Sequence, residues 1–246
     1  MSKSNPTLQN PCTKFINFKS DKGQFFFWNK ETEQQVEIPL PIYFIVLDEL
    51  STVSGFNKTH ESQIYSNEVH SMQKEVLRVK TFKGGESVIG LYNDIKDSIK
   101  ALGGKYTKSV YALLVNPDKS TELVNFKFKG ASFSAWLEKK INPMKSVIGI
   151  TEMTEETNGN TVYQVPVFVP FKLTQEYDER AVKADEILQD YLREYMAQIP
   201  EKEIAKAEAV EETYVANQDW QGGSRKQELI DKSKANDTEE DDLPFN

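Results

Sequence analysis

The chain has 246 residues, of which 38% are hydrophobic and 28% are charged, and its formal net charge at pH 7 is −8. This length allows one large domain, or one domain with appendages, and the composition allows a packed core. Cys12 is the only cysteine, which excludes an internal disulfide and a cysteine-based metal cluster. With only His60 and His70 besides, the sequence also argues against a structural zinc site, and we expect no cofactor and no metal.

The N-terminal residues contain no apolar stretch like that of a secretory signal, and no apolar run approaches 18 residues. We therefore expect a cytoplasmic protein that does not interact with membranes. The charge is distributed unevenly: residues 1–172 hold 21 Lys+Arg and 18 Asp+Glu, whereas residues 173–246 hold 9 and 20. A mildly basic body with a strongly acidic C-terminal arm suggests that the body binds a polyanion.

The first part of the body has the alternation and turn signals of short strands. The turn signal SDKG precedes the aromatic run FFFWN, as a hairpin requires. The segment 91–104 is predicted to be a helix, because Leu91, Ile95, Ile99 and Leu102 share one face and Gly103 can end it. Strands are predicted at 14–19, 23–29, 35–39, 42–47, 63–69, 76–82 and 88–91.

Strands resume after this helix, at 106–115 and 121–130. In the second of these, Leu123, Asn125, Lys127 and Lys129 alternate with Val124, Phe126 and Phe128, which predicts one buried face and one face bearing lysines. A short helix is expected at 131–140. A last hairpin is expected from 146–156 and 161–171, and its second strand should lie at a sheet edge because it contains Pro166 and Pro170.

The spacing between successive apolar residues changes at Leu173. Apolar residues then recur every three or four positions as far as Tyr195, which predicts an amphipathic helix over 173–197 that ends before Pro200. Residues 201–246 are charged and poor in large apolar groups, so we expect a flexible acidic tail. The expected divisions are therefore 1–172 as the body, 173–200 as the helix and 201–246 as the tail.

Catalytic motifs are absent from the sequence, which contains no P-loop, no G-x-S-x-G elbow and no H-E-x-x-H. Asp48 and Glu49 could be imagined as metal ligands of a nuclease. Neighbouring residues of a strand point to opposite faces, however, and no third acid lies at helical spacing from them. We therefore expect no catalytic residue and no enzymatic activity.

Lysines and aromatic residues alternate closely in the body, and this combination is typical of proteins that bind single-stranded nucleic acid. The four consecutive rings Phe25 to Trp28 cannot share one side of a strand, so two of them must face a second layer or a ligand. The candidate DNA-binding residues are Lys22, Phe26, Trp28, Lys30, Lys80, Lys83, Lys105, Tyr106, Lys108, Lys127 and Lys129.

The C-terminal sequence EDDLPFN places three apolar residues directly after a run of carboxylates. This ending resembles the acidic tip of bacterial single-stranded DNA-binding proteins, and phage replication proteins share the plan of an OB-fold followed by such a tail. Here Asn246 follows the phenylalanine, so the terminal carboxylate lies one residue further out. A polyanionic arm tethered beside a cationic groove behaves like a competing strand, so we expect the tail to mask the DNA site. The resemblance implies that the tail also docks onto replication and recombination proteins through Asp241, Asp242, Leu243, Pro244 and Phe245.

These observations favour a mainly β protein: an OB-like barrel with an interstrand helix, a long C-terminal helix that packs on it or mediates self-association, and a disordered acidic tail. The expected function is sequence-independent binding of single-stranded DNA in replication, recombination or repair. The resemblance implies a phage-encoded protein, in which case the compartment is the host cytoplasm. The alternatives are a structural or assembly protein of a virion and a metal-dependent DNA-processing enzyme. The preference for DNA over RNA stays open.

Overall fold

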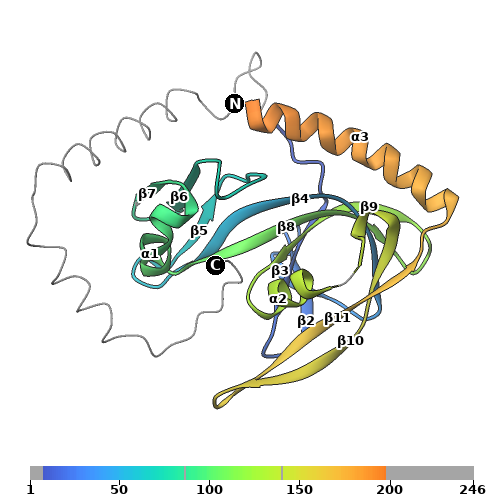
Figure 1. Cartoon of the computed structure of the whole chain (residues 1–246), viewed down its shortest axis with the longest axis horizontal. Coiled ribbons are helices and arrows are strands. Elements are labelled where there is room, and N and C mark those ends of the chain that lie inside the picture. Colours follow the sequence, from blue (N-terminus) through green and yellow to red (C-terminus); the bar gives the residue numbers. More distant parts are fainter. Residues whose placement is uncertain (1–7, 86, 140, 198–246) are drawn as a thin grey trace, which may run out of the picture. The chain divides into compact units, whose positions relative to one another are not determined.

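The computed structural model describes residues 8–85, 87–139 and 141–197, and these residues form one branched β-sheet accompanied by helices (Figure 1). The predicted tail and its tip lie outside the described residues. The elements, in chain order, are β1 (Lys14–Lys19), β2 (Gln24–Asn29), β3 (Gln34–Ile38), β4 (Ile42–Asn57), β5 (Ser62–Ser66), β6 (Leu77–Thr81), β7 (Ser87–Gly90), α1 (Tyr92–Leu102), β8 (Gly104–Val115), β9 (Thr121–Phe128), α2 (Ala131–Glu138), the 3₁₀ helix η1 (Pro143–Lys145), β10 (Ser146–Asn158), β11 (Thr161–Lys172) and α3 (Gln175–Ala197).

The sheet branches at β4, which is 16 residues long and thus spans about 50 Å. One edge of β4 pairs with β8 along most of its length. The other edge pairs with β10 near Ile42 and with β5 near Asn57. The main path runs β3-β2-β1-β9-β8-β4-β5-β6-β7, and the β10–β11 hairpin leaves it at β4. The predicted mainly β class is confirmed.

The predicted strands are confirmed with one large difference, which concerns β4. The apolar pattern predicts a strand over 42–47, but the observed strand continues to Asn57. A register shift between Val46 and Asp48 marks a bulge in β4, and beyond it polar residues such as Ser51 and Thr52 occupy buried positions. Because many residues from Asp48 onward are polar, the sequence pattern does not reveal that the strand continues to Asn57.

One face of the sheet holds two hydrophobic cores. The larger core gathers side chains from β1, β2, β4, β8, β9 and β10 beneath α2, whose Trp136 is fully buried there. The smaller core lies between β4–β7 and α1, where Ile95 and Ile99 are buried. Tyr106 of β8 packs against both cores and joins them. Gly103 ends α1 in the left-handed region, with φ 91°, so the predicted helix and its stop are confirmed.

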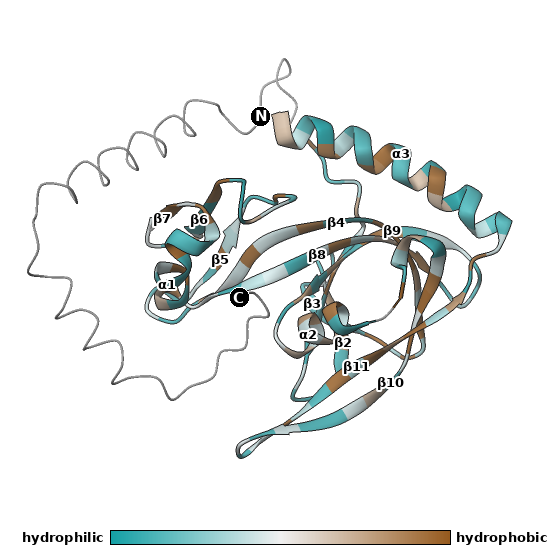
Figure 2. Cartoon of the chain, in the orientation of Figure 1, coloured by the Kyte–Doolittle hydropathy of each residue, from teal (hydrophilic) through white to brown (hydrophobic). Residues whose placement is uncertain are grey.

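The long helix α3 packs against the opposite face of the sheet, at β4 and β8. Leu188 and Leu192 are buried with Leu50 and Tyr111, and Ala181 is buried in a neighbouring cluster. Hydrophobic and hydrophilic bands alternate along α3 (Figure 2), as its amphipathic sequence predicts. Of the two expected roles of this helix, packing on the body is the one observed.

The β10–β11 hairpin projects from the body, and its tip is hydrophilic (Figures 1 and 2). In the described part of the chain β11 pairs only with β10, which confirms the edge position that Pro166 and Pro170 predict. Strand pairing does not close the sheet of the described residues into a barrel. No helix among those residues is long and apolar enough to span a membrane.

Candidate nucleic-acid interface

A broad cleft of about 1600 Å³ lies on the sheet face opposite the two cores that α1 and α2 cover. The strand register explains its position. Lys127 of β9 stands opposite Ser109 of β8 and opposite Asn17 of β1, so these three side chains share one face of the sheet. On β8 and β4 the same face continues through Lys105 and Ser54, which stand opposite each other. The cleft thus follows one face across five neighbouring strands, from β2 through β1, β9 and β8 to β4, and then reaches β5.

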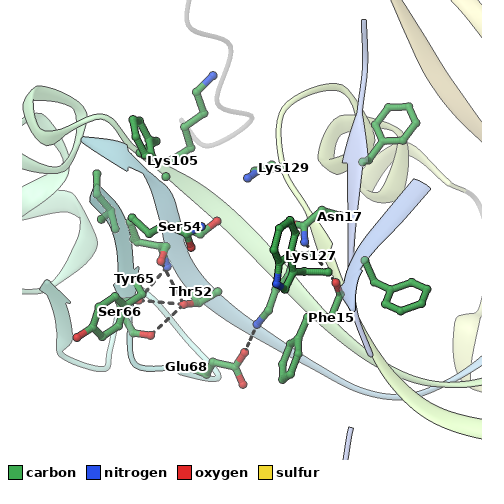
Figure 3. A pocket seen from close by; sticks show the side chains of 18 of the residues that line it. Phe15, Asn17, Thr52, Ser54, Tyr65, Ser66, Glu68, Lys105, Lys127 and Lys129 are labelled. Carbon is green, nitrogen blue, oxygen red and sulfur yellow. Dashed lines mark hydrogen bonds and ion pairs between the residues drawn. The ribbon is translucent and has the colours of Figure 1, made fainter. Parts of the chain in front are cut away.

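Exposed aromatic rings stand on both walls of the cleft. On the β1–β2 wall, Phe15 is 37% and Trp28 is 61% exposed, and Phe26 lies beside them. On the β4–β5 wall, Phe56 is 52% and Tyr65 is 48% exposed. Figure 3 shows Phe15 and Tyr65 on opposite sides of the cleft. Large rings that stay exposed in a concave site present stacking surfaces to a ligand.

Lysines and hydroxyl groups form the floor between these walls. Lys105 is exposed and Lys129 is half-buried, and neither forms an ion pair with a carboxylate of the described residues. Burial lowers the pKa of Lys129, and the positive charge of Lys105 lowers it further. The hydroxyls of Ser54 and Thr107 lie 2.7 Å apart. Two neighbouring ammonium groups without a counter-ion from the protein would gain from an anionic ligand.

Lys127 lies in the same floor, but its charge is already balanced. Its ammonium lies 2.5 Å from the carboxylate of Glu68 (Figure 3). Ser109 and Tyr111 also donate hydrogen bonds to Glu68, at 2.6 and 2.5 Å. Burial alone raises the pKa of Glu68, but the Lys127 charge and these hydrogen bonds outweigh it and lower that pKa. Glu68 therefore holds the floor together as a charged, fully hydrogen-bonded carboxylate.

The C-terminal end of α3 forms the end of the cleft. Tyr191 and Tyr195 both line it, and their rings stack with centroids 5.9 Å apart. Tyr195 accepts a hydrogen bond from the backbone N–H of Glu68 at 3.0 Å, and Tyr191 accepts one from the Asn10 side chain at 3.0 Å. These contacts fix the helix end to the cleft floor.

The structure divides the predicted DNA-binding residues into three groups. The cleft brings together six of them: Phe26, Trp28, Lys30, Lys105, Lys127 and Lys129. Lys22, Lys80 and Lys83 are exposed but do not line the cleft. Tyr106 and Lys108 lie on the opposite face: Tyr106 packs between the cores, and Lys108 pairs with Glu49 at 3.5 Å.

Sequence reasoning missed Phe15, Phe56, Tyr65 and Glu68. A local signal existed for Phe15 and Tyr65, because each alternates with a buried apolar neighbour, Ile16 and Ile64 respectively. Phe56 lies between Gly55 and Asn57 and had no such signal. No local signal existed for Glu68, whose partners lie on β8 and β9, more than 40 residues away in the chain.

The carboxylates considered for a nuclease do not converge. Asp48 stands opposite Tyr111 and Glu49 opposite Val110, so they point to opposite faces of β4. Asp48 accepts a hydrogen bond from Gln189 of α3, and Glu49 pairs with Lys108. Within residues 8–85, 87–139 and 141–197, no three His, Cys, Asp or Glu side chains are grouped so that they could hold a metal ion.

Comparison with known proteins gives no relative from which function could be transferred. No protein-family model, no curated protein and no solved structure matches the chain.

Proposed function

We propose that the chain binds single-stranded DNA in the cleft, without sequence preference and without a chemical step. The observation that carries this proposal is the arrangement of exposed rings on both walls with lysines between them. Rings stack on any base, and lysines neutralise phosphates and release their counter-ions. Among the described residues, the cleft is lined by six lysines and two carboxylates, one of which, Glu68, is already paired.

We further propose that the part of the sheet around the larger core acts as a partly open, OB-like barrel. Its support is the single core enclosed by β1, β2, β4, β8, β9 and β10, with α2 over it. A backbone hydrogen bond of 2.7 Å from Gln164 of β11 to Ser20 spans the gap between β11 and the β1–β2 turn. OB-folds are themselves partly open barrels that use one sheet face for nucleic acid.

The direct test is a titration of labelled oligo(dT), oligo(U) and duplex DNA, followed by gel shift and fluorescence anisotropy, with and without magnesium or manganese. The proposal requires tight binding to the single strand that weakens as salt rises. Absence of salt-dependent binding to any single strand would favour the structural or assembly role. Strand loss that requires metal and disappears in Asp48→Asn or Glu49→Gln would favour the enzyme.

The role of the acidic arm belongs to the same proposal. A tethered polyanion close to a cationic cleft competes with DNA at high effective concentration, and the apolar residues 243–245 can enter a pocket of a replication protein. Deleting 236–246 should tighten DNA binding at low salt and leave the melting temperature unchanged. Unchanged affinity would refute the masking role, and a binding assay with replication proteins tests the docking role separately.

A further inference from the structure

Phe82 is an exposed aromatic residue outside the cleft. It follows β6 directly and is 75% exposed, more than any other large hydrophobic side chain among the described residues. Its backbone is not loose, because its N–H donates a 2.9 Å hydrogen bond to Gln63 of β5. An exposed ring on an ordered backbone becomes a candidate contact when it adjoins other exposed rings in one patch.

The strand register places Phe82 on a continuation of the cleft face. Phe56 stands opposite Gln63, and Gln63 is bonded in turn to Phe82, so these three residues form one row across β4, β5 and β6. Tyr65 stands opposite Lys80 of β6 in the neighbouring row. Phe56, Gln63 and Tyr65 line the cleft. The surface that carries Lys80 and Phe82 therefore joins the cleft without a break.

The side chains of this surface lie outside the smaller core. Ile64 and Val79 point to the opposite face of β5 and β6, where they pack against Ile95 and Ile99 of α1. The outward residues have no helix over them in the described part of the chain. We call this surface the outer platform; it consists of Gln63, Tyr65, Lys80, Phe82, Ser87 and Ile89.

The chemistry of the outer platform matches that of the cleft. Its six members include a lysine and two rings but no carboxylate, and Lys83 is exposed next to Phe82. Diagonal neighbours on adjacent strands, such as Tyr65 and Phe82, lie about 7–8 Å apart, and their Cβ atoms are somewhat closer. This spacing is about twice the 3.4 Å that separates successive bases. Tyr65 and Phe82 thus stand close enough on one face for neighbouring nucleotides of one strand to reach both.

We propose that the outer platform is a second stacking station, which binds the nucleotides of a single strand that leaves the cleft across β5 and β6. This inference rests on the proposed function of the cleft and extends it. The single strand is the occupant because the platform continues the cleft and carries positive charge. A second copy of the chain or an apolar peptide would not require lysines around the ring.

The test is the affinity for oligo(dT) as a function of its length, measured for the full chain and three Phe82 variants. For the unchanged protein, affinity should rise with length and then rise again once the strand reaches the platform. Phe82→Ala should lower the affinity for long oligonucleotides at least about fivefold, the lower end for loss of one stacked base, and leave short ones unchanged. Phe82→Tyr should retain the affinity and Phe82→Leu should lose it, because stacking needs a ring.

Two controls make the outcomes distinguishable. Phe56→Ala, inside the cleft, should weaken binding at every length, whereas Val162→Ala, exposed on β11, should have no effect. An effect of Phe82→Ala at all lengths, or at none, overturns the outer platform while leaving the cleft intact. A change in sedimentation without a change in DNA affinity would assign Phe82 to self-association and overturn it too. Failure of the unchanged protein to bind any length overturns the proposed function itself.

Discussion

The salt dependence of DNA binding gives the sharpest test of the cleft, because the structure separates its free lysines from its paired ones. Lys14 is paired with Glu122 and Lys127 with Glu68. The remaining four lysines that line the cleft are without an ion pair among the described residues: Lys30, Lys58, Lys105 and Lys129.

The number of free lysines sets the expected slope. Each phosphate neutralised on a single strand contributes about −0.7 to the slope of log K against log salt, so four lysines give about −2.8. Raising salt from about 50 to about 200 mM should then weaken binding about 50-fold. Replacing Lys129 by glutamine should reduce the steepness by about 0.7, and replacing Lys105 should do the same.

The matched control removes a cleft lysine, Lys14, together with the carboxylate that pairs with it, Glu122. Changing Lys14 and Glu122 together to glutamine deletes one lysine but no net charge, so the slope should stay near that of the unchanged protein. Anisotropy titrations of oligo(dT) at five salt concentrations measure all slopes. Equal slopes for Lys129→Gln and the double variant would refute the division into free and paired lysines, and a slope near zero would refute phosphate binding.

Three further predictions concern the rings, the buried carboxylate and a lysine at the end of α2. Trp28→Ala and Phe15→Ala should each weaken oligo(dT) binding by about 1–3 kcal/mol without lowering the melting temperature, and quenching of tryptophan fluorescence by DNA should vanish only in the first. Glu68→Ala leaves the half-buried Lys127 ammonium, Ser109 and Tyr111 without their shared partner and should reduce the free energy of unfolding by about 3 kcal/mol, whereas a loss below about 1 kcal/mol in denaturant titrations would contradict the network. Burial lowers the pKa of Lys139 to about 8, so between pH 8 and the unfolded value of about 10.4 the unfolded chain binds more protons than the folded one. The free energy of unfolding, taken relative to that of the Lys139→Met variant, should therefore rise as the pH increases from 8 to about 10. If the difference in melting temperature between the two proteins stays constant from about pH 7 to 10, the lowered pKa of Lys139 is contradicted.

The faces of most strands could be predicted from sequence because one side of the sheet is buried. In β9 the alternation correctly separates Lys127 and Lys129 from Phe126 and Phe128. In β8 the alternation likewise separates Lys105 from Tyr106 and Lys108. From Val110 onward the residues of β8 are all apolar, so the sequence does not show which face each of them occupies, and the pairing of β8 with β4 and β9 is needed to assign the faces.

The cleft itself could be predicted only in part. Its cations and rings are visible in the sequence, but whether a lysine is free depends on carboxylates that are distant in the chain. Lys127 and Lys129 are equivalent in the pattern of β9, yet only the first meets Glu68. The two-sided arrangement of the rings likewise depends on β4 bringing Phe56 to a wall opposite Phe15, and the polar second half of that strand gave no hydrophobic signal.

The branching of the sheet at β4 has a consequence for any attempt to divide the body into smaller units. Excising 54–102 would remove most of the smaller core, but it would also leave Gly104 and Lys105 of β8 without a neighbour and expose the side of Tyr106 that packs against that core. Because one strand runs through both halves, neither half has a complete sheet when it stands alone. The described body is thus built to melt as a single cooperative unit, and shortened versions that end within β4 should aggregate.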